Sequence, residues 1–504
     1  MKMKNLKHIL LIFILIISIS SCEKFLDVND DPNAPANVSL DLRIKPTILM
    51  ANGAAQWRGA REIVAVTQYV ASKSKGANPD TWEFTTRNFF WQNALVWTFP
   101  NAVDMIVQGK EENSPHFSGV GKIFKAFLIA SLSDQYGRMP WDDLYDGIHQ
   151  PVLTPRFVDQ KTIYENCINL LDEAVVDLSA TDNKIGLNRR DGDIIYQGDT
   201  EKWIKFAYAL KARYLNHYSK KSGLYNPDAI IEACSKAFDD VGMDAEFNYV
   251  KGGSQTQANP WSAEGYGEFK SELFPRYAGY TQFFINMLKN PFFLNDSIDP
   301  RLPIIMNPAV KTGLFTGLVS GRGLDGKNIK EYCRVAGGFY SLADSPFPFA
   351  TYSEVKYIEA EARLRKGDAA GAIEAFKTGV LADMTKLGVA DTTIQKVSEG
   401  LNKLTPADFT ANNNKAGLSK IMTQKYIAMV FNPETWVDMR RMDYSNEIYP
   451  GLARPDNVNE IFGEGEWIRA MPYEYNEENR NGKNLGDNRP DVRMRTPVWW
   501  DIPE

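Results

Sequence analysis

One stretch of the sequence, residues 351–388 (TYSEVKYIEAEARLRKGDAAGAIEAFKTGVLADMTKLG), constrains the fold of the chain most strongly. In its first half, apolar residues recur three or four positions apart, which is the spacing that lines one side of a helix. Thr351 followed by Glu354 is a typical helix start, and Gly367 supplies a residue at which a helix can stop. The apolar stripe of this helix consists of Tyr352, Val355, Ile358 and Ala362.

The same spacing places the charged side chains of the first helix on its opposite face. These residues are Glu354, Glu361, Arg363 and Arg365. Charged residues are almost never fully buried unless they are paired, so we expect these four side chains to be solvated. The hairpin is then a packing unit rather than a ligand site.

A second helix follows directly after Gly367. Asp368 is a favourable cap for it, and an apolar stripe with Phe376 and Val380 runs toward Gly388. The small residues and the phenylalanine lie at offsets that resemble a tetratricopeptide repeat, a pair of antiparallel helices. One such hairpin cannot bury its own apolar face, so further helix pairs must stack on it.

Helical patterns extend over residues 41–238 and 351–442, separated by an irregular segment at 239–348 that is rich in Gly, Pro, Asn and aromatic residues. A long segment without its own repeat inside a compact protein is usually functional. We therefore expect a mainly α-helical fold, with tetratricopeptide-like hairpins supporting a loop-rich layer that has little strand. Residues 41–504 form a single domain in this interpretation, with an irregular tail at 443–504.

The N-terminal residues have the features of a secretory signal. Three lysines precede an apolar run at residues 9–19, which is too short to span a bilayer, and Ser20 and Ser21 precede Cys22. The order Ile-Ser-Ser-Cys is typical of a bacterial lipobox, in which the cysteine is lipidated; a plain signal peptide is the alternative. We predict a signal peptide at 1–21, a lipid anchor on Cys22 and a polar tether at 22–40.

Charge and cysteine content exclude several classes of function. The formal net charge is −6, and removal of the three lysines in residues 1–21, which contain no acid, changes it to −9. This balance does not suit a nucleic-acid partner. Cys167, Cys234 and Cys333 have no metal-like spacing, and we expect buried free thiols rather than a disulfide framework.

Motifs for enzymatic chemistry are weak. Residues 321–326 (GRGLDG) match a dinucleotide fingerprint formally, but no strand–helix–strand pattern surrounds them, so we interpret them as a glycine-rich turn. His217 falls near an apolar helical stripe and suits a core or rim position. We expect no metal and no cofactor. A glycosidase-type pair of carboxylates stays open, because its separation in space is not encoded in sequence spacing.

Aromatic residues are abundant in the segments that read as loops. Flat rings with polar edges suit stacking on sugars, although many of them can instead attach the loop layer to the helices. Trp82 and Trp261 are the strongest candidates, because each follows an Asn-Pro break. The full set is Trp82, Trp91, Trp97, Trp261, Tyr266, Tyr277, Trp467, Trp499 and Trp500.

Eight segments, in order along nearly the whole chain, resemble the SusD/RagB family of nutrient-binding outer-membrane lipoproteins. They are CEKFLDVNDDPNAP from Cys22, SDQYGRMPWDDLYDG from Ser133, GDTEKWIKFAYALKARYLNHYSK from Gly198, DPRLP at 299–303, TYSEVKYIEAEARLRKGD from Thr351, IMTQKYIAMVFNPETWVDMRR from Ile421, MPYEYNEENRN from Met471 and VWWD from Val498. Arg138 departs from the acidic residue that more often follows the glycine of the YGxxP turn, so we assign that turn no ligand role.

The resemblance implies a function and a set of partners. It implies a non-enzymatic lipoprotein facing the cell exterior of a Bacteroidetes-type bacterium and acting as the lid of a SusC-like TonB-dependent transporter. The ligand it implies is an oligosaccharide; a peptide receptor is the first alternative, and a surface glycoside hydrolase the second. The family's ligand loops fall on two regions of this chain, which gives the predicted ligand-binding residues Trp82, Arg87, Asn259, Trp261 and Tyr266.

Overall fold

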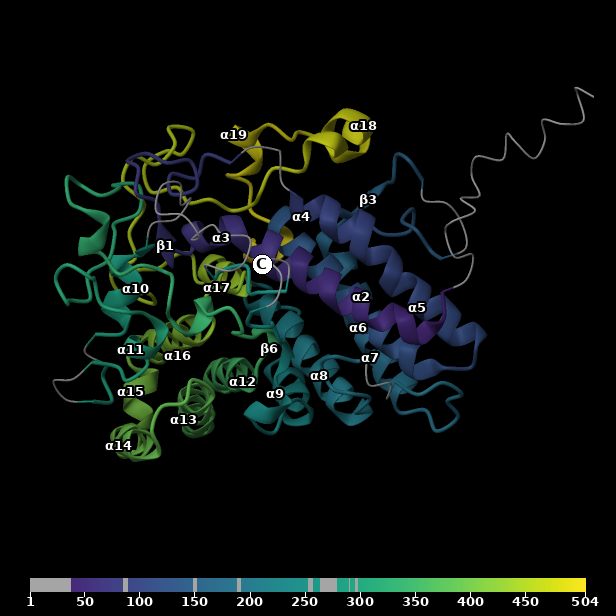
Figure 1. Ribbon diagram of the computed structural model, residues 1–504, viewed down its shortest axis with the longest axis horizontal. Coiled ribbons are helices and arrows are strands. Elements are labelled where there is room, and N and C mark those ends of the chain that lie inside the picture. The colour runs from purple at the N-terminus through teal and green to yellow at the C-terminus, as the bar shows by residue number, and fades with distance from the viewer. Residues whose placement is uncertain are drawn as a thin grey trace, which may run out of the picture.

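The computed structural model describes residues 38–84, 89–147, 152–187, 192–252, 257–262, 279–289, 291–294 and 298–504. Helices are the main secondary structure of the described residues. The few strands among these residues form three two-stranded sheets (Figure 1). The expected mainly helical fold is therefore confirmed. The predicted signal peptide and Cys22 lie outside the described residues, as does the tether up to residue 37. Among the helices described, none has the length and apolar character needed to cross a membrane.

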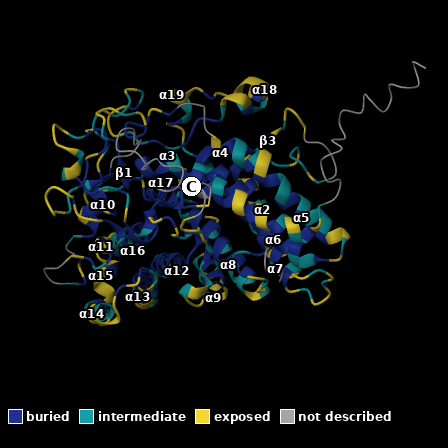
Figure 2. Cartoon of the chain, in the orientation of Figure 1, coloured by how far each residue is buried: buried dark blue, intermediate teal, exposed yellow. Residues whose placement is uncertain are grey.

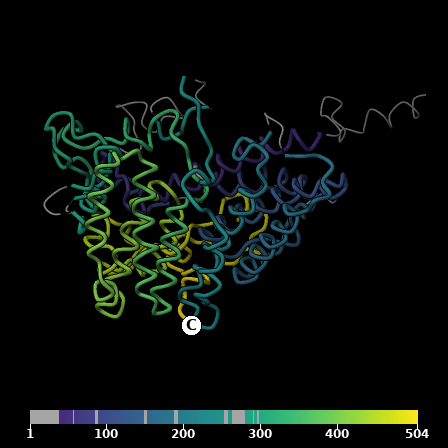
Figure 3. The backbone as a smooth tube through the Cα atoms, turned by 90° about the horizontal axis from the view of Figure 1, so that it is seen from below, coloured from purple at the N-terminus to yellow at the C-terminus, as the bar shows by residue number. Residues whose placement is uncertain are grey.

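Most of the long helices pack in one continuous row, each against the next. Figure 3 shows the later members standing side by side. This arrangement is the stack of helical hairpins that the amphipathic pattern of residues 351–388 requires. In order of contact the row consists of α5 (Phe99–Glu111), α6 (Pro115–Tyr136), α7 (Gln160–Leu178), α8 (Thr200–Asn216), α9 (Pro227–Lys236), α12 (Tyr352–Lys366), α13 (Ala369–Lys386) and α14 (Asp391–Leu401).

The hairpin of α12 and α13 forms as its sequence predicts. The Thr351 side chain accepts the backbone N–H three residues further on (3.1 Å), and Asp368 does the same at the start of α13 (2.9 Å). Gly367 ends α12 in the left-handed region, with φ 92°. Gly379 allows the two helices to approach closely, because a Cβ there would lie 2.9 Å from the ring of Tyr357.

The prediction that the charges of α12 are solvated is wrong for two residues. Glu354 and Glu361 are buried, because α12 has packing partners on both sides. Each is paired with an arginine from another helix: Glu354 with Arg213 of α8 and Glu361 with Arg441. The other two charged residues, Arg363 and Arg365, are half-buried.

The first third of the chain contains two π-helical segments that pack against each other. Segment η1 (Asn52–Arg58) joins α2 (Leu40–Ala51) to α3 (Ala60–Val66). Segment η2 (Asn93–Thr98) joins α4 (Phe89–Gln92) to α5. π-Helical turns occur frequently at functional sites, so this pair identifies a surface to inspect for a ligand.

The described part of segment 239–348 is irregular, as expected, and strand pairing attaches it to the rest of the molecule. Gly321 and Gly323 adopt φ values of 78° and 70° within a turn, and no long helix follows them, so the nucleotide fingerprint is a glycine-rich turn. The sheets pair β4 (Ala245–Phe247) with β6 (Phe347–Ala350), β1 (Val70–Ala71) with β5 (Gly279–Tyr280), and β2 (Met139–Pro140) with β3 (Phe157–Val158). The short helices are η4 (Val241–Met243), α10 (Gln282–Met287), α11 (Leu302–Ile305), η5 (Ile329–Glu331) and η6 (Phe339–Ser341).

The C-terminal part adds a second set of helices and a tail that crosses the molecule. The tail contains short helices, which its irregular sequence did not predict, and Trp500 near its end is fully buried. Buried residues from Leu40 to Trp500 form one continuous apolar core (Figure 2). The elements here are α15 (Pro406–Thr410), α16 (Lys415–Ala428), α17 (Glu434–Arg441), α18 (Tyr475–Leu485), α19 (Pro490–Arg493) and η7 (Trp499–Asp501); η3 (His217–Lys220) lies at the end of α8.

Candidate ligand-binding surface

The two tryptophans predicted to contact ligand are fully buried and lie in different parts of the core. Trp82 packs against Phe462 and Trp467 of the C-terminal tail, with both ring centroids 5.3 Å away. Trp261 packs against two other rings, Trp57 of η1 at 4.9 Å and Phe431 at 4.6 Å. In this structure neither ring has a free face for stacking on a ligand.

Asn259 shapes the loop that carries Trp261. Its amide donates to the carbonyl of Ser345 (3.0 Å), and its side-chain oxygen accepts the backbone N–H of Trp261 (2.8 Å). Asn259 is fully buried, so these bonds replace water and fix the loop. Arg87 and Tyr266 lie outside the described residues, and their predicted ligand role stays a prediction.

An exposed aromatic surface begins two residues after Arg87. Phe89 and Trp97 are 55% and 50% exposed. The side-chain amide of Asn93 donates to the carbonyl of Phe89 (2.7 Å), and that of Asn101 donates to the carbonyl of Trp97 (2.8 Å). We call these four residues the aromatic–amide stripe, because they recur every four positions along α4, η2 and α5.

Apolar and basic side chains surround the stripe. Met50 of α2 lies next to Asn101, with its sulfur 3.5 Å from the amide nitrogen. The Arg58 guanidinium lies 5.5 Å from the centre of the Phe89 ring, within the range of a cation–π contact. Arg58 follows Trp57, the ring that contacts Trp261, so Phe89 and Trp261 both contact η1.

This surface can bind a flat, uncharged ligand that carries hydroxyl groups. Eight residues separate Phe89 from Trp97, which corresponds to about 10–12 Å along the helix. Two rings at that spacing can stack on successive parts of an extended chain, while the Asn93 amide between them and the Asn101 amide after Trp97 bind hydroxyl groups. Trp97 was among the aromatic candidates from the sequence, whereas Phe89 was not. The four-residue alternation of aromatic and Asn residues was the signal that could have identified it.

Comparison with known families decides the identity of the chain. A family model described as "Starch-binding associating with outer membrane" matches residues 33–461. The chain belongs to this SusD-like family. The order of motifs in the sequence had predicted this membership, and it is confirmed. No curated protein matches the sequence.

Solved structures with the SusD-like fold cover nearly all of the chain. A SusD/RagB family protein from Bacteroides thetaiotaomicron matches with a TM-score of 0.73 and 21% identity, covering 93% of this chain and 100% of its own. A chitin-binding protein matches with a TM-score of 0.74 and 21% identity, covering 92% of this chain and 100% of its own. A chitin-binding SusD homolog from Flavobacterium johnsoniae matches with a TM-score of 0.71 and 16% identity, covering 92% and 98%.

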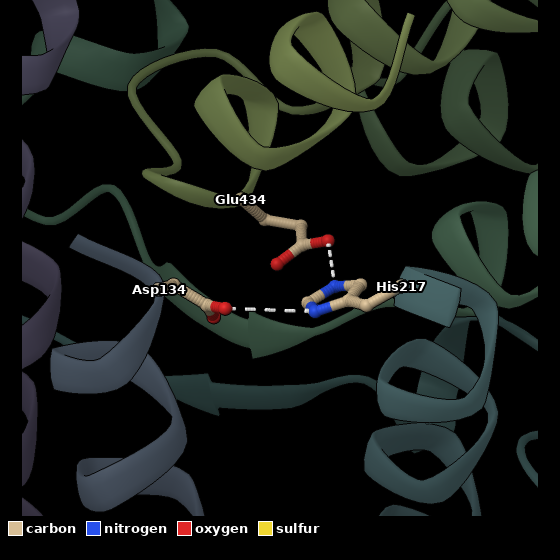
Figure 4. Close-up of side chains that lie close together, drawn as sticks. All are labelled: Asp134, His217 and Glu434. Carbon is tan, nitrogen blue, oxygen red and sulfur yellow. Dashed lines mark hydrogen bonds and ion pairs between the residues drawn. The ribbon is translucent and has the colours of Figure 1, made fainter. Parts of the chain in front are cut away.

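The SusD-like core also contains a buried cluster of titratable groups. His217 lies between two carboxylates, with its Nε2 2.7 Å from Glu434 and its Nδ1 3.6 Å from Asp134 (Figure 4). The Tyr164 hydroxyl and the Trp500 indole also bond to this cluster. Burial opposes protonation of His217, but the two carboxylates outweigh it and raise its pKa to about 9.

The side chains of this cluster are bonded to one another inside the core. One ligand atom from each of the three residues lies within 4.8 Å of the others, and Figure 4 shows each ring nitrogen of His217 facing its own carboxylate, Nε2 facing Glu434 and Nδ1 facing Asp134. All three side chains are buried, which keeps Asp134 and Glu434 away from any substrate. The cluster is a structural junction between α6, α17 and the end of α8. It confirms the expected core position of His217.

Proposed function

We propose that this protein is a non-enzymatic outer-membrane binding protein that captures an oligosaccharide on the aromatic–amide stripe. The observation that supports the proposal most directly is the pair of half-exposed rings, Phe89 and Trp97, eight positions apart on the continuous run of α4 and η2. Members with the same fold are named as chitin-binding, and the family description names starch. Both are chains of neutral sugar rings, which suit stacking on exposed aromatic faces.

The proposal extends to anchoring and delivery. A lipid on Cys22 would hold the protein at the outer membrane with its binding surface toward the cell exterior. A SusC-like TonB-dependent transporter would then receive the ligand, with this chain acting as its lid. Replacement of Cys22 by Ala should release the protein from the membrane fraction. Purification of the tagged native protein from membranes should recover the transporter.

Calorimetry against a panel of chitin, starch and other neutral oligosaccharides tests the binding site. The double variant Phe89→Ala, Trp97→Ala should weaken binding by about 5- to 150-fold, because each stacked ring contributes about 0.5–1.5 kcal/mol. Val176→Ala is a control, since Val176 is an exposed apolar residue on α7, which Figure 1 shows apart from α4. Unchanged affinity in the double variant would show that the stripe is not the binding site.

The same panel, extended with peptides, separates the alternatives. If peptides bind and no glycan does, the ligand is a peptide and the protein is still a receptor. Release of shortened sugars from any glycan would contradict the non-enzymatic proposal. If the transporter is recovered and no small ligand binds, the protein is a scaffold that binds only another protein.

A further inference from the structure

Two adjoining hollows lie near the end of the molecule at which Figure 1 shows α14, α15 and α16. One hollow of about 410 Å³ lies between residues 286–289, 291–292 and α16, and another of about 450 Å³ lies between residues 292–294, α14 and α15. Both volumes fall within the range of small-molecule sites. The two hollows share Phe292 and Lys420, so we treat them together as the Phe292 groove.

The centre of the groove is an aromatic ring held in place from behind. Phe292 is 45% exposed, and its ring stacks on the fully buried Phe376, with centroids 6.1 Å apart. A Cβ on Gly400 would lie 1.9 Å from the carbonyl oxygen of Phe293, so α14 comes this close only because residue 400 is glycine. The Lys420 ammonium lies 5.4 Å from the centre of the Phe292 ring.

The groove is basic in a chain that is acidic overall. Five lysines line it, against three carboxylates, whereas the whole chain has a net charge of −6. Two of the carboxylates already have partners: Glu447 pairs with Lys415, and Asp408 caps its own helix. Within the described ranges no carboxylate lies at ion-pair distance from the other lysines of the groove. These are Lys289, Lys396, Lys403 and Lys420.

We propose that the Phe292 groove binds an acidic oligosaccharide, with Lys396, Lys403 and Lys420 pairing with its carboxylate or sulfate groups and Phe292 contacting a sugar face. An exposed ring beside unpaired ammonium groups combines the two contacts that such a ligand needs. Burial lowers the pKa of Lys420, so a bound anion would compensate for the lost hydration of its charge. This site is separate from the aromatic–amide stripe and does not depend on it.

Calorimetry at low salt tests the groove with three probes of similar length: a galacturonic acid oligosaccharide, a sulfated galactan oligosaccharide and a neutral galactan oligosaccharide. At least one acidic probe should bind at least tenfold more tightly than the neutral probe. Comparison of the affinities for the two acidic probes distinguishes recognition of carboxylate from recognition of sulfate. Equal affinity for all three probes, or no binding of either acidic probe, would overturn the proposal.

Two sets of variants separate the groove from general charge attraction. Lys396→Gln, Lys403→Gln, Lys420→Met should weaken binding of the acidic probe at least tenfold. The control Lys45→Gln, Lys110→Gln, Lys184→Gln removes the same charge from exposed lysines near the other end of the molecule and should leave the affinity within twofold. Equal losses in both sets would overturn a specific site. Phe292→Leu keeps the charges and should weaken binding severalfold; unchanged affinity in this variant would contradict the proposed ring contact.

Discussion

Arg441 and Glu361 form a fully buried ion pair with two hydrogen bonds that joins α17 to α12. The bonds are 2.8 Å and 2.9 Å long, and Asn216 donates a further bond of 2.8 Å to the same carboxylate. Burial opposes ionisation of Glu361, but the charges of Arg441 and Arg365 outweigh it and hold its pKa well below the ordinary value. The pair therefore connects the helical row to the C-terminal helices through a charged contact inside the core.

Removal of one member of this pair should be strongly destabilising. Arg441→Met leaves the Glu361 carboxylate buried with fewer partners, and breaking a buried pair in this way costs about 3–5 kcal/mol. Urea denaturation measures the loss. Arg365→Met is the control, because Arg365 contacts the same carboxylate from a half-buried position and should cost about 1 kcal/mol or less. Equal losses in the two variants would contradict this account.

The His217 junction predicts a loss of stability at alkaline pH. The folded-state pKa is about 9, against 6.5 as the ordinary value, so the protonated form is favoured by folding. The contribution is fully present below pH 6.5 and is lost as the pH rises through about 9. Thermal unfolding between pH 6 and 10 should therefore show a steeper decline for the wild type than for His217→Gln. Parallel curves for the two proteins would show that His217 does not titrate in this range.

The buried tryptophans are expected to act on stability rather than on affinity. Trp261→Ala removes a ring enclosed by Trp57 and Phe431 and should cost about 3–5 kcal/mol. Glycan binding by the folded fraction should be unchanged, because the stripe does not include this ring. Calorimetry on protein shown to be folded by circular dichroism measures the affinity. If the variant loses glycan binding but keeps its full stability, Trp261 contributes to the ligand site.

Local signals in the sequence were sufficient for the helical hairpin but not for its charged side chains. Thr351, Gly367 and Asp368 act through backbone groups within four residues, so their roles can be predicted from spacing alone. The burial of Glu361 depends on Arg441, which is 80 residues away in the sequence. A stripe pattern cannot show that the outer face of a helix will itself be covered.

The sequence indicated regions in which to look for a ligand site, but not which aromatic rings are exposed, because exposure also depends on distant partners. The sequence favours Trp82 and Trp261 over Trp97 as ligand contacts, yet the first two are buried and Trp97 is half-exposed. The difference arises from distant partners, such as Phe431 behind Trp261 and Phe462 behind Trp82. Ring exposure is set by tertiary packing, so a list of aromatic residues identifies candidates and the fold selects among them.

Phe376 links the stability of the helical row to the Phe292 groove. Its fully buried ring contacts Phe409 at 5.5 Å and stacks on Phe292 at 6.1 Å. Phe376→Ala should lower the free energy of unfolding by about 3–5 kcal/mol, because the space left by the removed ring lies between Phe409 and Phe292. Neutral glycan affinity at the stripe should be unchanged in the folded fraction, whereas acidic probes should bind more weakly because Phe292 loses the ring behind it. Urea denaturation and calorimetry measure the two effects, and a selective loss of neutral glycan binding would show that the hairpin contributes to the stripe.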